Sequence, residues 1–576
     1  MQRTVATRLL AGLILVISPT AYAGIDLARG LCTWDQWGGG ASHQGNACVA
    51  AQPPRYELAH IVFDPFEFQE IAAQDGGLNV HYQTPLTDDD DNFFMMHKAG
   101  TYVSCDPPEA AQPGCGADRA NVLNQVWTEK GYHFGTDGRT EERWTFTSDW
   151  KPIGGTFFEQ MFQPALSGPF LYIPGAGGSV FQVLKSNGFA IQRIMPFRTI
   201  DPDTYVTGGI TIGPLGFLYW NVVKVDPATG GHTGFIVAAA PWGSTKVVGY
   251  DHLIPGAPAA TDLCFGRFSS LTTPFPWPPP AGLLPAQVPC GAQRPGLGVT
   301  PAIGADGTVY TASRADGQDN YSYVIALRPD LSLQWATSLR GVLNDGCLVE
   351  ARAPFFNPAR VCPPGSPVGI DPFTNLPPAQ TVDDESSAAP VVLPDGGVLF
   401  GATRFYDSAR GVLLKLDRRG TVTAHYNFGW DTTPAIYPHD GTYSIITKDN
   451  HYFDFFPQSG PFYMTQLSKD LVPEWQFENT TTESCMFDDS GTLQCTPRDA
   501  AATGFEWCVN APVVDKQGTV LAVAEDGYLY VIRQGGVLEE RVFLNQSLGA
   551  AYTPSAVDAR GRIYALNNGE LTIFGR

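Results

Sequence analysis

Charged residues are scarce in this chain of 576 residues, because Asp, Glu, Lys and Arg make up 16% of it, against about 25% in an average soluble domain. Basic residues are the scarcer sign, with 36 against 57 acidic residues and a formal net charge of −21. Nucleic acid phosphates and anionic membranes repel such a chain, so we expect neither as a partner. Beyond the N-terminus, no apolar run reaches the roughly 18 residues of a membrane-spanning helix.

The motifs of several common enzyme classes are missing as well. The chain has no GxSxG of the nucleophile-elbow hydrolases, no HExxH and no P-loop. No CxxC or CxxCH occurs, which argues against a zinc site, a thioredoxin-like motif and a covalent c-type haem. The sequence therefore identifies no catalytic residue and no metal ligand, and it leaves open whether the protein is an enzyme.

The N-terminus has the pattern of an export signal. Two arginines and the apolar run Leu9–Ile17 precede a small-x-small cleavage site over 21–23. We expect residues 1–23 to be removed and the mature protein to be secreted or periplasmic. Gly24, which follows the cut in place of a cysteine, argues against a lipid anchor.

All 11 cysteines lie in the exported part, where an oxidising compartment favours disulfides. Spacing suggests five close pairs, which are Cys32–Cys48, Cys105–Cys115, Cys264–Cys290, Cys347–Cys362 and Cys485–Cys495. Cys508 is left over, and a Cys495–Cys508 bridge is an alternative.

One pattern recurs along the chain: a short apolar strand after a proline, a turn that ends in glycine, and a second strand rich in β-branched and aromatic residues. The clearest copy covers 300–310 and continues with strands over 323–327 and 333–336. Period-2 strands joined by tight Asp/Gly turns predict a four-stranded antiparallel sheet. Copies begin at positions 85, 164, 210, 301, 390, 434, 512 and 554.

Repeats of this size indicate propeller blades. We therefore predict an all-β fold, an eight-bladed β-propeller over 56–576, after a signal peptide and a lead-in segment over 24–55; seven blades is the alternative. The last repeat is too short for four strands, so we expect 56–63 to supply the missing strand. The acidic run 88–91 falls in the first hairpin turn of its repeat, which favours a solvated turn over a metal site.

Four repeats carry insertions, near 103–121, 251–297, 341–385 and 480–508. Three follow a fourth strand, and the other lies between a second and a third strand. In a four-stranded meander these two loop types emerge from the same face, so we expect disulfide-stapled insertions on one face, where function usually resides. The alternative is that the insertions cap the channel or mediate assembly.

Polar and aromatic residues fall at the same face, where they begin the first strands or lie in the loops between second and third strands. Carboxylates beside aromatic rings suit a sugar, a polyol, a cation or a bound metal. The candidate ligand-binding residues are Asp383, Asp384, Glu385, Arg404, Trp430, Asp431, Lys448, Glu506 and Asn510, and His81 falls nearby.

The repeats resemble those of the quinoprotein-like (pyrroloquinoline quinone-type) β-propeller superfamily. The hairpin over 301–310, the strand over 323–327, Trp335 and the opening WDQWG at 34–38 carry the resemblance. It implies either a dehydrogenase that holds pyrroloquinoline quinone (PQQ) and calcium in the propeller funnel, or a member of the branch that binds ligands or proteins without a cofactor. The chain has no adjacent cysteine pair, and the family's Asp-x-x-Thr-Gly motif occurs at 226–230 without counterparts in the other repeats.

We therefore expect an exported quinoprotein-like propeller that binds a small molecule, a glycan or a protein at its insertion-bearing face. One alternative is a PQQ- and calcium-dependent dehydrogenase of alcohols or sugars. The other is a carbohydrate-active hydrolase or lyase that uses paired carboxylates.

Overall fold

The structure is a computed structural model. The chain forms two compact units, residues 1–31 and residues 32–576. All that follows concerns the second unit. None of its described helices is long and apolar enough to cross a membrane. The expected export signal, Cys105, Cys115 and Arg404 lie outside the described residues. Those described are 32–73, 78–102, 124–156, 158–265, 287–343, 346–347, 362, 365–371, 376–403, 411–451, 460–487, 490, 492–497, 504–544 and 553–576.

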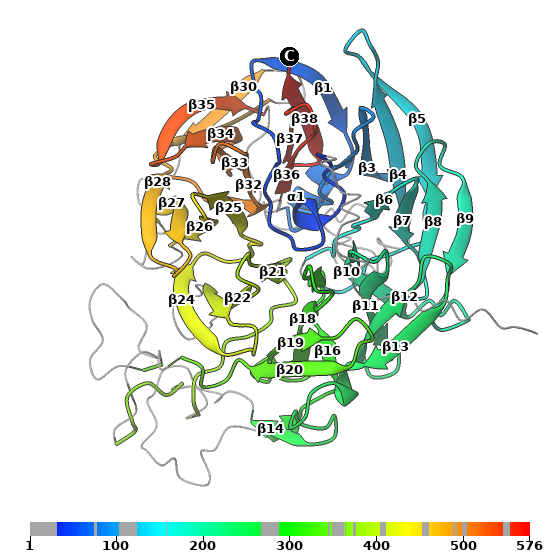
Figure 1. Ribbon diagram of the computed structural model, residues 1–576, viewed down its shortest axis with the longest axis vertical. Coiled ribbons are helices and arrows are strands. Elements are labelled where there is room, and N and C mark those ends of the chain that lie inside the picture. Colours follow the sequence, from blue (N-terminus) through cyan, green and yellow to red (C-terminus); the bar gives the residue numbers. More distant parts are fainter. Residues whose placement is uncertain are drawn as a thin grey trace, which may run out of the picture. The chain divides into compact units, whose positions relative to one another are not determined.

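Eight antiparallel sheets follow one another around a ring, so the predicted eight-bladed propeller is confirmed and the seven-bladed alternative is wrong (Figure 1). Blade 1 consists of β2 (Leu86–Thr87), β3 (Asn92–Gly100), β4 (Gln125–Phe134) and β5 (Thr140–Thr147), and blade 2 of β6 (Ala165–Ser167), β7 (Phe170–Pro174), β8 (Val180–Leu184) and β9 (Ala190–Ile194). Blade 3 consists of β10 (Thr204–Ile212), β11 (Leu218–Val225), β12 (His232–Ala239) and β13 (Thr245–Gly249). Blade 4 consists of β16 (Gln293–Pro295), β17 (Ala302–Ile303), β18 (Val309–Ala315), β19 (Tyr323–Leu327) and β20 (Leu333–Ser338).

Blade 5 consists of β21 (Val391–Val392), β22 (Val398–Thr403), β23 (Gly411–Leu416) and β24 (Val422–Phe428), and blade 6 of β25 (Ala435–His439), β26 (Thr442–Asn450), β27 (Phe462–Ser468) and β28 (Pro473–Glu478). Blade 7 consists of β32 (Val513–Val514), β33 (Val520–Val523), β34 (Tyr528–Arg533) and β35 (Val537–Phe543). Blade 8 consists of β36 (Thr553–Val557), β37 (Ile563–Asn567), β38 (Glu570–Gly575) and β1 (Tyr56–Val62), and β31 (Val509–Ala511) also pairs with β36. Because β1 pairs antiparallel with β38, the first strand of the propeller completes its last blade.

Short elements outside the blades include one α-helix, α1 (Glu67–Ala73), and two 3₁₀ turns at Trp37–Gly39 and Tyr250–His252. Two hairpins, β14 (Leu263–Phe265) with β15 (Gln287–Pro289) and β29 (Glu483–Phe487) with β30 (Leu493–Pro497), lie within expected insertions. Each hairpin is pinned by a disulfide, Cys264–Cys290 or Cys485–Cys495.

Four of the five predicted cysteine pairs form disulfides, the other two being Cys32–Cys48 and Cys347–Cys362. Because Cys495 bonds to Cys485, the Cys495–Cys508 alternative is wrong. Cys508 is a buried free thiol. Burial and neighbouring carboxylates raise its pKa well above the ordinary value, so it stays protonated at neutral pH.

The same hydrogen bond recurs in the first hairpin turns of several blades. An aspartate accepts a hydrogen bond from the backbone N–H two residues later, at 2.8–3.0 Å in five blades. In four of these turns a glycine with positive φ follows, whereas in blade 1 that place is taken by Asp91, with φ 60°. The five aspartates are Asp88, Asp306, Asp395, Asp515 and Asp558.

The acidic run 88–91 forms such a turn, but it is less solvated than expected. Asp88 is buried and accepts a hydrogen bond of 2.7 Å from Lys185 of blade 2. Asp91 pairs with Arg560 and Arg562 of blade 8. The run therefore joins blade 1 to both of its neighbours, and those cations offset part of its charge, while Asp89 and Asp90 are exposed as expected.

The lead-in segment follows the ring of first hairpin turns and contacts all eight blades. In Figure 1 its dark blue trace lies inside the ring. Its hydrogen bonds, in chain order, are Trp34 with Thr87, Asp35 O with Leu166 N, the Gln36 side chain with Ile212, Ala41 O with Ile303 N, Ser42 O with Val392 N, Gln44 O with Ile436 N, Gly45 O with Val514 N, and Gln52 N with Gly561 O.

The circuit requires close approach of the backbones. Gly45 has φ 57°, and a Cβ there would lie 2.9 Å from both the Ala435 side chain and the Pro512 carbonyl. The Cys32–Cys48 disulfide joins the two ends of the circuit. The segment is therefore a closed strap across the ends of the innermost strands.

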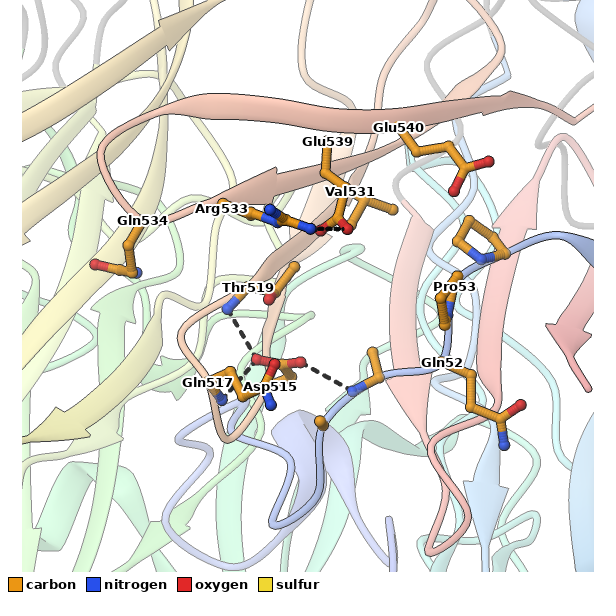
Figure 2. Close-up of a pocket in the computed structure, with 13 residues that line it drawn as sticks. Gln52, Pro53, Asp515, Gln517, Thr519, Val531, Arg533, Gln534, Glu539 and Glu540 are labelled. Atoms are coloured by element: carbon orange, nitrogen blue, oxygen red, sulfur yellow. Dashed lines mark hydrogen bonds and ion pairs between the residues drawn. The ribbon is translucent and has the colours of Figure 1, made fainter.

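Near the end of the lead-in segment, residues 50–54 lie against blades 7 and 8 and form one wall of a pocket (Figure 2). Ala51 N donates to the Asp515 carboxylate at 2.9 Å, and Gln52 Nε2 donates to the Arg560 carbonyl at 2.7 Å. The apolar core fills the spaces between blades, where large buried side chains such as Trp127, Trp150 and Trp220 pack between neighbouring sheets.

Candidate functional site

Antiparallel order within each blade divides the connections between two ends of the ring. The first and third hairpin turns, with the strap, lie at one end, which we call the turn end. The blade-to-blade connections and the loops between second and third strands lie at the other, which we call the insertion end. The eight described candidate ligand-binding residues belong to the insertion end, and the ninth, Arg404, lies outside the described residues.

A buried carboxylate, Asp431, links three blade connections at the insertion end. It accepts hydrogen bonds from Ser386 Oγ at 2.9 Å, Ser387 N at 2.6 Å and Ser387 Oγ at 3.0 Å. Its other oxygen lies 3.0 Å from His81 Nε2, which precedes blade 1. Asn510, ahead of blade 7, donates to Ser387 Oγ at 2.9 Å.

The pKa values in this cluster are set by burial and by neighbouring groups of opposite charge. Burial raises the pKa of Asp431, but the nearby His81 and Lys448 bring it below its ordinary value. Lys448, in β26, is fully buried, and burial lowers its pKa against the opposing charges of Asp431 and Glu506. Asp431, Lys448 and Asn510 are thus internal groups that bind the blades together.

A layer of rings lies next to this cluster. The His81 ring stacks on Phe158 with centroids 4.9 Å apart, and Phe158 meets Trp430 edge to face at 5.5 Å. Trp430 is half-buried, and its Nε1 donates to Asp383 Oδ2 at 2.9 Å. Residues from the connections ahead of blades 1, 2, 5 and 6 therefore meet here.

Asp383 and Glu385 remain nearer to solvent than Asp431. Asp383 accepts hydrogen bonds from Glu385 N at 3.1 Å and from Thr403 Oγ1 at 3.3 Å, as well as from Trp430. Burial and the charge of Asp384 raise the pKa of Asp383. Glu385 is exposed, and partial burial together with Asp383 and Asp384 raises its pKa as well.

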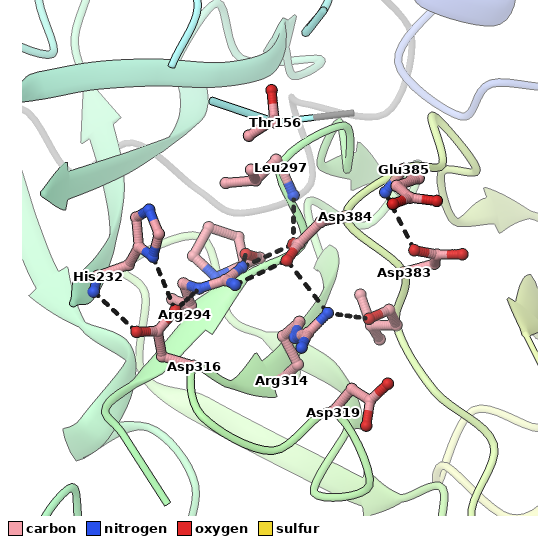
Figure 3. A network of polar contacts seen from close by, with 12 residues as sticks. Thr156, His232, Arg294, Leu297, Arg314, Asp316, Asp319, Asp383, Asp384 and Glu385 are labelled. Carbon is pink, nitrogen blue, oxygen red and sulfur yellow. Dashed lines mark hydrogen bonds and ion pairs between the residues drawn. The ribbon is translucent and has the colours of Figure 1, made fainter. Parts of the chain in front are cut away.

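Asp384, between them in sequence, is held in a separate ion network (Figure 3). Arg294 donates to both of its oxygens, at 2.6 and 2.7 Å, and Arg314 lies 3.1 Å away. Arg294 also donates to Asp316 at 2.6 Å, and Asp316 accepts from His232. Burial alone raises the pKa of Asp384, but the two arginines lower it to about 2.

The structure thus separates the candidates into two groups. Asp431, Lys448 and Asn510 are buried and Asp384, though partly exposed, is held by two arginines, while Asp383, Glu385, Trp430 and Glu506 reach solvent at least in part. Sequence reasoning missed Arg294, which lies in the additional strand β16 ahead of the fourth repeat. A charged residue beside a repeat's first strand, without a counterpart in other repeats, is the signal that marks it.

Among the described residues, the acidic side chains do not form the calcium site that the resemblance implies. Calcium takes six to eight oxygen ligands. Within the described ranges, no group of three or more His, Cys, Asp or Glu side chains is arranged to hold a metal ion. Asp384 is instead held by arginines, and Asp431 by serines and His81.

Comparison with known proteins bears on the fold. No protein-family model and no curated protein matches the chain. Quinohemoprotein alcohol dehydrogenase from Comamonas testosteroni is similar in structure, with a TM-score of 0.50 and 11% identity over 96% of this chain and 82% of that one. BamB from Moraxella catarrhalis gives a TM-score of 0.41, with 12% identity over 90% of this chain and 99% of that one.

A europium-containing methanol dehydrogenase gives a TM-score of 0.45, with 10% identity over 93% of this chain and 89% of that one. At such identities the likeness concerns the fold. The comparison thus supports the β-propeller fold.

Proposed function

We propose that the protein is an exported ligand-binding propeller and that its insertion end binds an organic cation, such as a primary or quaternary amine. The binding residues are Asp383, Glu385 and Trp430, which we call the acidic rim. The observation that carries the proposal is an imbalance of charge. Arg294 and Arg314 are committed to Asp384, while Asp383 and Glu385 lie beside it with raised pKa values.

A cationic ligand relieves this imbalance. Carboxylates held close together repel one another, and a positive charge placed beside them removes the repulsion and stabilises both ionised forms. Trp430 adds an aromatic ring next to the carboxylates, and a cation over the face of a tryptophan gains a further attraction. Acidic groups also attract a cation from a distance, which favours its encounter with a chain of net charge −21.

Calorimetric titration of the mature protein with spermidine and with choline tests the proposal, with glucose as the neutral control. We expect saturable binding of at least one amine that weakens about tenfold in Glu385→Gln and in Trp430→Ala, since each removes one charged or aromatic contact. Glu141→Gln, an exposed carboxylate on β5 paired with Arg143, is the matched control and should leave binding unchanged. Absence of amine binding, or unchanged binding in both rim variants, contradicts the proposal.

The same two carboxyls favour a second candidate, a carbohydrate-active hydrolase or lyase. Enzymes of this kind take their general acid from a carboxyl whose pKa is raised, as the pKa values of both Asp383 and Glu385 are. Release of reducing sugar from a polysaccharide panel, lost in Glu385→Gln, supports this candidate, and glucose-containing ligands that bind without turnover argue against it.

A further inference from the structure

The pocket at the turn end belongs to a different part of the molecule from the acidic rim. It has a volume of about 550 Å³ and lies between residues 50–54 and blade 7 (Figure 2). Its volume lies within the range of 300–1,000 Å³ that is typical of small-molecule sites. Its floor includes Val531, which is 5% exposed, and Thr519.

The walls of this pocket are fixed. The Asp515 carboxylate receives Ala51 N at 2.9 Å and the backbone N–H groups of Gln517 and Thr519 at 2.8 Å, so it ties the strap's continuation to the first turn of blade 7. Lys516 N donates to the Val49 carbonyl at 3.1 Å. Pro53 adds a rigid backbone to the same wall, because its ring fixes φ. A ligand therefore meets a pre-formed site.

Charges of both signs line the pocket on the blade 7 side. Arg533 and Glu539 form an ion pair across the last hairpin of the blade, with side chains 62% and 33% exposed. Exposed pairs of this kind contribute little stability, so the guanidinium can exchange Glu539 for a ligand carboxylate. The hydrogen bond from Arg533 lowers the pKa of Glu539, with a smaller contribution from Arg55 at the edge.

Glu540 supplies a second negative charge in a different place. It lines the pocket next to Pro53 in Figure 2 and forms no ion pair with any residue in the described ranges. The residues that line the pocket include no aromatic ring on which a sugar would stack. The pocket thus presents a cationic side chain, Arg533, and a carboxylate, Glu540, that has no ion pair within the described ranges. These two groups match a ligand that carries one negative and one positive charge.

We propose that this pocket binds a zwitterionic small molecule, a free amino acid or a short peptide. Arg533 receives the α-carboxylate, Glu540 receives the α-ammonium group, and Val531 and Pro53 contact the apolar part. The proposal concerns the turn end and does not rest on the function proposed for the acidic rim.

Calorimetric titration with alanyl-alanine tests this assignment, with the N-acetylated and C-amidated dipeptides and glucose as comparison ligands. We expect the free dipeptide to bind saturably. Blocking either terminus, or introducing Arg533→Gln or Glu540→Gln, should weaken binding about tenfold, because each change removes one charge-assisted contact. Arg328→Gln, an exposed arginine in the corresponding turn of blade 4, is the matched control and should bind as the unmodified protein does.

Several results overturn the proposal. The first is that the free dipeptide does not bind saturably. The second and third are that the blocked dipeptides bind equally well or that glucose binds better. The fourth is that both pocket variants bind as the parent does while their melting temperatures match that of the parent. Glu385→Gln keeps the two sites distinguishable, because it should retain dipeptide binding even if the acidic rim binds no amine.

Discussion

Arg294 is a buried guanidinium that pairs with two partly buried carboxylates, Asp384 and Asp316, so its removal should destabilise the protein strongly. Its side chain is 3% exposed, and it donates to both oxygens of Asp384 and to Asp316. Breaking a buried ion pair from one side costs about 3–5 kcal/mol, since a buried charge is left without its partner. The pKa of Asp384, lowered from 3.8 to about 2, corresponds to roughly 2.5 kcal/mol of stabilisation of its ionised form.

Arg294→Met should therefore lower the free energy of unfolding by about 3 kcal/mol at pH 7, the lower end of that range, because Arg314 still lies beside Asp384. The depressed pKa means that the stabilisation by Asp384 is present above its ordinary pKa and is lost as the pH falls through about 2. In Arg294→Met the carboxyl loses its main partner, so its pKa should rise and the deficit should shrink as the pH falls towards 4.

Urea unfolding followed by tryptophan fluorescence at pH 7 and pH 4.5 measures the effect. Adding Asp384→Asn to Arg294→Met should recover part of the loss, because the uncompensated charge is gone. Arg533→Gln, which breaks an exposed pair, should cost at most about 1 kcal/mol. A deficit below 1 kcal/mol in Arg294→Met, or no recovery in the double variant, refutes the reasoning.

Three further predictions concern other parts of the molecule. Amine binding at the acidic rim should weaken as the pH falls through the raised pKa of Glu385, because the protonated carboxyl no longer attracts a cation; titrations between pH 4 and 7 check this, and a flat profile contradicts it. Gly45→Ala should lower the melting temperature, because the new Cβ meets Ala435 and the left-handed backbone disfavours alanine; an unchanged melting temperature would show that the strap is dispensable. Burial raises the pKa of Glu129 to about 8, so stability should fall as the pH rises from about 4.5 to 8, and Glu129→Gln should flatten that slope in thermal melts.

The number of blades was predictable because each repeat carries its own local signal. The Asp-to-Gly turns specify hairpins at short range, so even blade 1, where Asp91 takes the place of the glycine, remains recognisable. The charge balance of the acidic run was not predictable in the same way. Its partners Arg560 and Arg562 lie more than 460 residues later and come close only when the ring closes.

The candidate site shows the same limit. Spacing placed Asp383, Asp431 and Asn510 at one end of the ring, and the structure puts them there. Spacing could not reveal that Asp431 contacts His81, which lies 350 residues away, because that contact depends on which blade connections meet in the folded ring. The segment with Phe158 also enters this region, and its sequence has no counterpart in other repeats.

Closure of the axis determines where ligands are able to bind. Trp37 of the strap is fully buried, packs with Met161, Ala389 and Ala511 from three blade connections, and donates to Thr433 Oγ1 at 3.1 Å. Thr433 lies two residues after Asp431, so the strap and the polar cluster meet within the ring. Packed side chains thus separate the two ends, which makes the acidic rim and the turn-end pocket separate surfaces.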